Sequence, residues 1–353
     1  MMPNNKNELI GYHAYKKNNK KVCVIIPAYN EQNNIKICIE AICQVFVDLD
    51  CQLEIIVVDD GSQDNTVQEV NSIIDIYPLK LIKLSRNFGK EHAMIAGLDN
   101  SDADAVIIMD ADLQHPVEML PIFIKKWLEG NDIVYAYREN RNDEGILKRI
   151  FAHFFYSMLN IGSEVPIQHG ALDFRLLDRK VVKALCGLRE RVRFMKGLYA
   201  WVGYKSIGIP CIPNQRYSGD TKFIFKNLLY LAWDGLISFS DFPLKAMVAT
   251  GALISIISFL YAAYICIKTM IFGVDLPGWA TLVVAISFFG GIQLLSLGII
   301  GSYIKNIFIE TKQRPNYIIE KEIQSRLLYW NKYTLKPYNF ETKEYQSDIF
   351  SSC

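Results

Sequence analysis

The chain has 353 residues and a formal net charge of +1, so its composition excludes the strongly basic surface typical of a nucleic-acid-binding domain. Its hydrophobic fraction of 51% and mean hydropathy of +0.12 are high for a soluble protein, and the excess lies mainly in the last third. The eight cysteines form no CxxC or histidine-paired spacing, which predicts buried reduced thiols. Residues 1–21 are polar and basic without an apolar segment, so we expect no secretory signal there.

The first part of the chain alternates short apolar runs with segments of helical character. The predicted strands are 22–26, 53–58, 79–84, 105–109 and 132–137, and the predicted helices are 33–47, 64–76, 91–98 and 121–129. This alternation predicts an α/β domain with a doubly wound, mostly parallel sheet. Ligands of such sheets bind outside the carboxyl ends of the strands.

Polar loops follow these predicted strand ends. They are Pro27-Ala28-Tyr29-Asn30-Glu31, Asp59-Asp60-Gly61-Ser62, Ser85-Arg86-Asn87-Phe88-Gly89-Lys90 and, after the fifth strand, the segment that holds Arg138 and Arg141. Because the carboxyl ends of parallel strands lie at one edge of a sheet, the sequence predicts a single polar site there.

The loop after the fourth predicted strand carries two carboxylates. Asp110 and Asp112 are spaced i, i+2 and therefore project to the same side, where both can reach one hard cation. Gln114 repeats the spacing and adds a neutral oxygen, and Pro116 directs the chain away from the strand. The alternative for these residues, taken alone, is an acidic turn without a ligand.

The middle of the chain is less regular. We expect helices over 147–161 and 178–188, one or two edge strands over 202–212 and a polar loop over 216–223. Arg189, Arg191 and Arg193 form either a solvated face or a contact with anionic lipid headgroups. The histidines His92, His153 and His169 are interpreted as helix or loop residues without a catalytic role.

The last third predicts membrane association. Residues 226–242 form an amphipathic helix whose Trp and Tyr suit a membrane interface. Residues 246–267 and 276–304 contain no charged side chain and are long enough for the ~30 Å hydrocarbon core. The short turn at 273–277 predicts a hairpin, and its basic flanks predict that both ends are cytoplasmic. A buried helical hairpin of a soluble protein is the alternative.

Several common nucleotide and hydrolase motifs are missing from the sequence. There is no GxxxxGK[ST] phosphate loop, no GxGxxG after the first predicted strand and no GxSxG turn. These absences disfavour a P-loop nucleotidase, a dinucleotide-binding Rossmann domain and an α/β-hydrolase.

Four motifs in order give a specific resemblance. They are Val24-Ile25-Ile26-Pro27-Ala28-Tyr29-Asn30-Glu31, Val57-Val58-Asp59-Asp60-Gly61-Ser62, Arg86-Asn87-Phe88-Gly89-Lys90-Glu91 and Asp110-Ala111-Asp112, with Asp173-Phe174-Arg175-Leu176-Leu177 farther along. The chain resembles the inverting family 2 glycosyltransferases with a GT-A fold. With the carboxyl-terminal hairpin it is similar to polyprenyl-phosphate glycosyltransferases, above all the bactoprenol glucosyltransferases of O-antigen modification, and more distantly to dolichol-phosphate mannose synthases.

The resemblance implies roles for individual residues. Pro27, Tyr29, Glu31, Arg86 and Lys90 would bind the nucleotide sugar, and one of Asp59 and Asp60, with Asp60 preferred, would contact the base. Asp110 would also contact the nucleotide-sugar donor. Together with Asp112 and Gln114 it would bind Mg²⁺ or Mn²⁺ on the donor's diphosphate. Asp112 is expected to be indispensable, and Arg138, Arg216 and Lys222 would meet phosphate groups. His115 departs from the family, which commonly has an acid before the proline.

The resemblance also implies an organisation and a reaction. We expect a polar extension at 1–20, a catalytic domain at 21–224, a juxtamembrane helix at 225–243, a hairpin at 244–305 with spans of about 246–270 and 278–304, and a cytoplasmic tail at 306–353. The expected location is the inner membrane of the cell, with the catalytic domain and both termini in the cytoplasm. The expected assembly is a homo-oligomer. Relatives that share this hairpin suggest that it is a tetramer.

The expected reaction is the transfer of glucose from UDP-glucose to undecaprenyl phosphate, for modification of a cell-envelope glycan. A lipid phosphate is already ionised at neutral pH and needs no general base, and its direct attack would invert the anomeric centre. UDP-N-acetylglucosamine, UDP-galactose and GDP-mannose remain alternative donors. A processive polysaccharide synthase is disfavoured by the missing QxxRW motif. A non-catalytic membrane scaffold that binds nucleotide sugars is the alternative of another class.

Overall fold

The computed structural model describes residues 20–138, 170–212, 242–272 and 278–327. Its eight strands form one sheet in the order β7-β5-β6-β4-β1-β2-β3-β8. The strands are β1 Lys21–Ala28, β2 Gln52–Asp59, β3 Leu79–Leu84, β4 Ala105–Ile108, β5 Ile133–Arg138, β6 Ala171–Asp178, β7 Ser206–Cys211 and β8 Ile319–Gln324. The pairs β1·β2, β1·β4, β2·β3 and β5·β7 are parallel, so the predicted α/β class with a mostly parallel sheet is confirmed.

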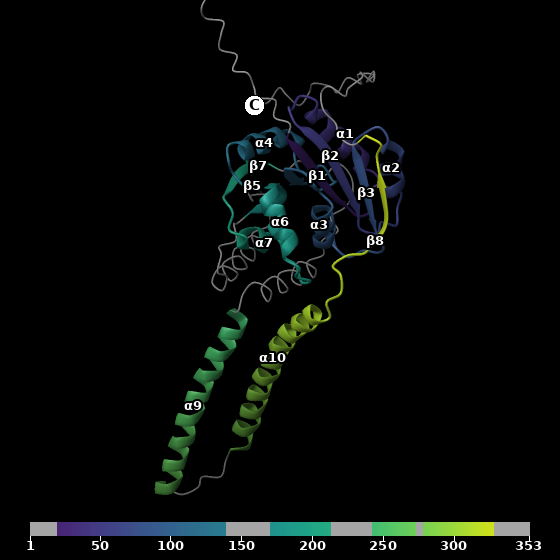
Figure 1. Ribbon diagram of the computed structural model, residues 1–353. Coiled ribbons are helices and arrows are strands. Elements are labelled where there is room, and N and C mark those ends of the chain that lie inside the picture. The colour runs from purple at the N-terminus through teal and green to yellow at the C-terminus, as the bar shows by residue number, and fades with distance from the viewer. Residues whose placement is uncertain (1–19, 139–169, 213–241, 273–277, 328–353) are drawn as a thin grey trace, which may run out of the picture.

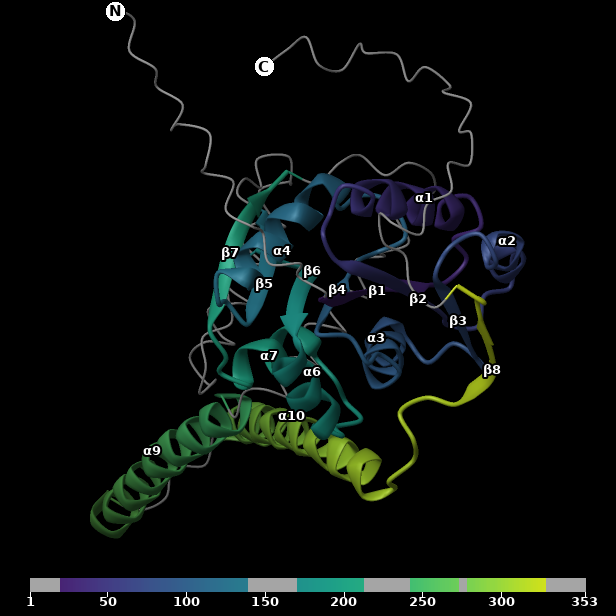
Figure 2. The same ribbon diagram turned by 45° about the horizontal axis from the view of Figure 1, so that its top comes forward.

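Helices cover both faces of this sheet (Figure 2). On one face lie α1 Ile35–Phe46, α2 Thr66–Ile73 and α4 Leu120–Leu128, which follows the 3₁₀ turn Val117–Met119. On the other face lie α3 Lys90–Asp99, α6 Arg179–Gly187 and α7 Met195–Trp201. The strands contribute a buried apolar core on both faces, as expected for a doubly wound sheet.

Two strands were not predicted. β6 pairs antiparallel with β4 and β5, and β8 pairs antiparallel with the edge strand β3. The sequence of β6 does not look like a buried strand, because it contains the charged residues Asp173 and Arg175, yet β6 lies between β5 and β4 inside the sheet. β8 lies within the segment that we expected to be a cytoplasmic tail, and the ion pairs Lys80–Glu322 and Lys83–Glu320, each 2.8 Å long, tie it to β3.

Helix α3 lies very close to β1 because Gly97 has no side chain. A Cβ atom at this position would lie 2.4 Å from Cγ2 of the fully buried Ile25. Gly97→Ala is therefore expected to destabilise the protein by about 1–3 kcal/mol, measured by chemical denaturation. The control is Gly187→Ala, at a helical glycine with no atom within 4 Å of the added carbon, which should not destabilise.

Two long helices extend away from the sheet domain (Figure 1). They are α9 Phe242–Phe272 and α10 Trp279–Thr311, and their apolar segments Pro243–Tyr261 and Phe288–Thr311 are long and apolar enough to cross a membrane. Apart from Pro243, no residue of either segment is buried inside the protein, and Val248 and Leu294 are each 71% exposed. Such a surface is unfavourable in water, so this geometry argues against the buried helical hairpin of a soluble protein.

The predicted turn at 273–277, the helix at 147–161, the polar loop at 216–223 and the extension at 1–19 lie outside the described residues, as does nearly all of the predicted juxtamembrane helix. α10 continues to Thr311, beyond the predicted span end at 304. Cys23, Cys38, Cys43, Cys51 and Cys211 are buried free thiols.

Candidate active site

The loops after β1 and β2 are joined to each other by hydrogen bonds. The backbone N–H of Asn30 donates to Ser62 Oγ at 2.9 Å, and the N–H of Gln63 donates to Asn30 Oδ1 at 2.8 Å. The N–H of Glu31 donates to Thr66 Oγ1 at 2.8 Å. Asn30 has a positive φ of 56°, a conformation that asparagine tolerates better than most residues. The predicted nucleotide residues Pro27, Tyr29 and Glu31 thus lie on or beside a braced loop at the carboxyl edge of the sheet.

Asp60 joins the β2 loop to the β3 loop. Its two carboxylate oxygens accept the backbone N–H groups of Phe88 at 2.7 Å and Gly89 at 2.9 Å. The loops touch beside it, because a Cβ atom on Gly61 (φ 72°) would lie 2.6 Å from the carbonyl carbon of Arg86. Asp59 accepts the N–H of Ser62 at 3.3 Å, and burial raises the pKa of both aspartates. Asp60 therefore holds a loop, and which of the two contacts a base stays a prediction.

The loop after β4 turns sharply at Leu113, between the predicted metal ligands Asp112 and Gln114. Leu113 has a φ of 60°, and the N–H of Gln114 donates to Asp112 Oδ1 at 3.2 Å. His115 accepts the backbone N–H of Asp110 on Nδ1 at 3.3 Å and stacks on Phe174 with ring centroids 4.9 Å apart. Burial lowers the pKa of His115, which favours the neutral ring that this acceptor role requires. The residue that departs from the family pattern thus supports the acidic loop.

Lys90 brings two acidic segments together. Its Nζ lies 2.6 and 2.8 Å from the two carboxylate oxygens of Asp110 and 3.1 Å from Oδ2 of Asp173. Although burial opposes it, the charges of Asp110 and Asp173 raise the pKa of Lys90. The cations Lys90, Lys196 and Arg175 likewise lower the pKa of Asp173 against the effect of its burial. Asp173 was not among the predicted site residues, and its motif in the resemblance was the only signal for it.

The acidic cluster offers part of the ligand set that a divalent cation needs. Asp110, Asp112 and Gln114 offer the hard oxygen ligands that Mg²⁺ and Mn²⁺ prefer, and Oδ1 of Asp173 is buried without a hydrogen-bond partner among the described residues. Within those same ranges, no group of three His, Cys, Asp or Glu side chains has a metal-binding arrangement. A cation would thus use two carboxylates and neutral oxygens, and it would share Asp110 with Lys90.

The remaining predicted site residues are distributed differently. Arg86 donates from Nη1 to the carbonyl of Asn87 at 2.9 Å, and its guanidinium lies 4.0 Å from the ring centroid of Phe88. In these contacts the Arg86 side chain packs against residues of its own loop. Arg138 ends β5, and its backbone N–H donates to the carbonyl of Gly170 at 3.1 Å. Arg216 and Lys222 lie outside the described residues.

Glu91, next to Lys90, is expected to make the stability of the protein depend on pH. Burial, followed by the charge of Asp173, raises the pKa of Glu91 to about 7, although its carboxylate accepts the N–H of Met195 at 3.0 Å. An acid with a raised folded-state pKa binds more protons folded than unfolded, so stability falls as pH rises from about 4.5 to about 7. Glu91→Gln should remove this loss. The free energy of unfolding of the variant minus that of wild type should therefore be about 1–3 kcal/mol larger at pH 8 than at pH 5. Urea unfolding at both pH values checks this, and an equal difference at the two would contradict it.

Comparisons with known proteins give matches to glycosyltransferases. The sequence profile of Glycosyl transferase family 2 matches residues 23–186. An uncharacterized glycosyltransferase of Synechocystis is 44% identical over 85% of this chain and 94% of its own length. The bactoprenol glucosyl transferase of Shigella phage SfV is 40% identical over 86% of this chain and 99% of its own length. The solved mannosyltransferase of Pyrobaculum calidifontis covers 82% of this chain and 87% of its own, at 20% identity and a TM-score of 0.41, and only loosely matches its shape.

Proposed function

This chain is a glycosyltransferase that belongs to glycosyl transferase family 2, and on that premise we propose that it transfers glucose from UDP-glucose to undecaprenyl phosphate at the cytoplasmic face of the cell membrane. Family membership confirms the resemblance drawn from the sequence motifs. The transfer itself is supported by relatives named bactoprenol glucosyl transferase, which match this chain over almost their full length.

The observation that supports a lipid acceptor is the exposed apolar surface of α9 and α10. These helices have 31 and 33 residues, which at ~1.5 Å per residue gives each a length of about 46–50 Å. A hydrocarbon core of ~30 Å would cover their apolar segments and remove them from water. A polyprenyl chain dissolves in that same layer, so its phosphate would lie at the membrane surface near the sheet domain. Multi-pass insertion with both termini in the cytoplasm belongs to this proposal.

The donor would bind where the loops after β1, β2, β3 and β4 meet. Glu31, Tyr29 and one of Asp59 and Asp60 would bind the nucleoside, and Lys90 and Asp110 would lie toward the diphosphate. The hydrogen bonds that join the loops support this role, because a preformed pocket loses little conformational entropy on binding. Arg138, Arg216 and Lys222 would meet the acceptor or donor phosphates.

The acidic loop would bind Mg²⁺ or Mn²⁺ through Asp110, Asp112 and Gln114, and the ion would supply positive charge beside the leaving diphosphate. The protein residues would orient the two substrates so that an oxygen of the ionised lipid phosphate faces the anomeric carbon. No proton has to be removed from that oxygen, so a general base is unnecessary. Attack from the face opposite the diphosphate inverts the configuration, and an α-linked donor would give a β-linked lipid phosphosugar.

A donor panel tests this proposal. Purified protein in detergent or lipid is given undecaprenyl phosphate, Mg²⁺ and one labelled donor at a time from UDP-glucose, UDP-N-acetylglucosamine, UDP-galactose and GDP-mannose. The expected result is a labelled lipid product from UDP-glucose, with a β-anomeric linkage by NMR. Preference for another donor would refute the glucose assignment. Binding of a donor without turnover of any would instead support the scaffold reading.

A further inference from the structure

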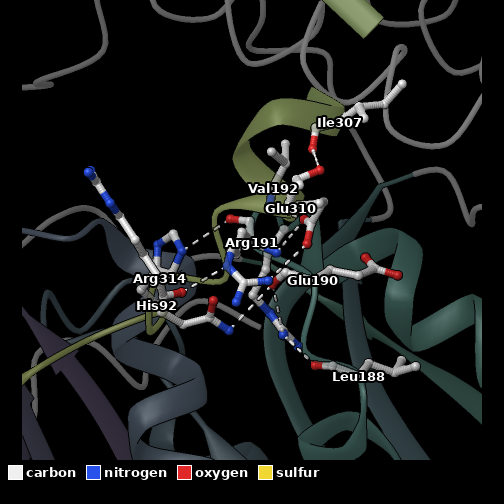
Figure 3. Close-up of polar contacts among 11 residues, drawn as sticks. His92, Leu188, Glu190, Arg191, Val192, Ile307, Glu310 and Arg314 are labelled. Atoms are coloured by element: carbon white, nitrogen blue, oxygen red, sulfur yellow. Dashed lines mark hydrogen bonds and ion pairs between the residues drawn. The ribbon is translucent and has the colours of Figure 1, made fainter. Parts of the chain in front are cut away.

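The end of α10 is joined to the sheet domain by one carboxylate. Glu310, in the last turn of α10, accepts the backbone N–H of Arg191 at 2.6 Å and that of Val192 at 3.3 Å (Figure 3). Its second oxygen lies 3.2 Å from Nη1 of Arg191. Arg191 also donates from Nε to the backbone carbonyl of Arg314 at 2.8 Å, so it is bound both to the last turn of α10 and to the chain that follows it. This contact fixes α10 to the loop between α6 and α7.

That loop is fixed in turn to the first turn of α3. The carbonyl of Arg191 lies 3.3 Å from Nε2 of His92 (Figure 3). The carbonyl of Phe88 lies 2.9 Å from Nδ1 of the same ring. Glu91 accepts the N–H of Met195 at the start of α7. Glu91 therefore holds the first turn of α3 against the loop that Glu310 contacts. A neutral imidazole donates from only one nitrogen, so His92 adds to this contact in the tautomer with the proton on Nε2.

The first turn of α3 is also part of the candidate site. Lys90 begins this helix and bonds Asp110 and Asp173, and the preceding Phe88 and Gly89 donate their N–H groups to Asp60. The backbone N–H of Ser85, where the loop begins, donates to the carbonyl of Ile318 at 2.9 Å, in the segment that leads from α10 to β8. The Lys90 loop thus contacts, at both of its ends, segments that are joined to the end of α10 by hydrogen bonds or by the chain itself.

We propose that Glu310, Arg191 and His92, here called the α10 relay, are positioning residues that hold Lys90 on Asp110 in a fixed relation to α10. The proposal rests on the proposed function, because the position of a helix in the membrane matters to a reaction whose acceptor lies in that membrane. The relay would keep the diphosphate end of the site aligned with the membrane surface while the lipid phosphate attacks.

The relay contributes more to position than to stability. The Glu310 side chain is 41% exposed, and ion pairs of that exposure contribute little to the free energy of folding. Its loss should therefore leave the protein folded while releasing the loop and the helix turn that carry Lys90. This separation makes the proposal testable apart from stability.

Hydrogen exchange tests the relay without reference to activity. Glu310→Ala removes the acceptor of the Arg191 and Val192 N–H groups, and it is expected to speed amide exchange in residues 86–93 about tenfold. Exchange in α1, on the opposite face of the sheet, should not change. The control is Arg189→Ala, because that arginine is 63% exposed and bonds Asp99 instead of Glu310, and it should leave residues 86–93 unchanged. Unaltered exchange of residues 86–93 in Glu310→Ala would overturn the proposal.

A double-mutant cycle tests the link to Lys90. Glu310→Ala is expected to lower kcat for transfer about tenfold with little change in KM for the nucleotide sugar, and Glu310→Gln, which keeps the oxygen acceptor, should restore most of the rate. In a Lys90→Met background the same Glu310→Ala change should cost less than about twofold. An equal loss in both backgrounds would refute the positioning role. Failure of the wild-type enzyme to glycosylate a lipid phosphate would refute the proposed function, and the exchange result would stand independently of it.

Discussion

Replacement of Asp112 by asparagine is expected to lower the rate of sugar transfer by about 10²–10³-fold, the loss typical when one stabilising group at a developing charge is removed. Asparagine keeps the size of the side chain and an oxygen that can accept the N–H of Gln114, so the loop should keep its shape. The change removes one negative charge from the group that would bind the cation. Initial rates of lipid-product formation measure the effect, and thermal unfolding verifies the fold.

The matched control is Asp102→Asn. Asp102 precedes the same strand, β4, at its opposite end, and its side chain is 89% exposed and paired with Arg179. The same chemical change at the wrong end of the strand should leave the transfer rate within about twofold of wild type, as for most exposed substitutions. If Asp112→Asn kept near wild-type activity, Asp112 would not bind an essential cation and the scaffold reading would gain support.

Lys90→Met is expected to reduce both activity and stability. It leaves the carboxylates of Asp110 and Asp173 close together without the cation between them, which should cost about 1–2 kcal/mol of folding free energy after allowance for a lysine side chain that is 41% exposed. The transfer rate should fall about 10²-fold, because the acidic loop loses its fixed position. Denaturant unfolding and initial rates measure the two effects.

The stability loss should depend on pH in a defined direction. Lys90 helps to lower the pKa of Asp173, so this contribution is present above about pH 4 and is lost as pH falls further. The difference between wild type and Lys90→Met should therefore be large at pH 7 and shrink toward pH 3. Lys126→Met, which breaks a surface pair with Glu129 on α4, is the control and should show a small loss in stability and none in activity. An effect of Lys90→Met that did not vary with pH would contradict the assigned charge interaction.

The strands that could be predicted are those whose sequence is locally apolar. β3 has the predicted bounds 79–84, and β1, β2, β4 and β5 lie within a few residues of their predicted positions. β6 escaped prediction because its charged residues are compensated only by tertiary contacts, as when Arg175 lies 3.7 Å from the ring centroid of Tyr199. β8 has three consecutive charged residues between Ile319 and Ile323, so it lacks the alternation typical of a strand. Its strand partner β3 lies more than two hundred residues earlier in the chain.

The sequence predicted where in the sheet the candidate site lies, but only some of the contacts between its side chains. The sequence order of the loops predicts the edge of the sheet at which they meet, and Asp60, Lys90 and Asp110 do lie in contacting loops there. The partnership of Lys90 with Asp173 could not be predicted, since it joins segments 83 residues apart through an unrecognised strand. The supporting role of His115 depends on a stack with Phe174 that the sequence does not specify.

The most direct measurement of the central claim compares two acceptors. Wild-type protein with Mg²⁺ and UDP-[¹⁴C]glucose is supplied either with undecaprenyl phosphate or with undecaprenol, which lacks the phosphate. We expect a labelled, solvent-extractable lipid only with undecaprenyl phosphate, because an ionised phosphate oxygen can attack without a general base, whereas the hydroxyl group of undecaprenol would have to lose a proton. No labelled lipid with undecaprenyl phosphate, or equal labelling of the two acceptors, would contradict it.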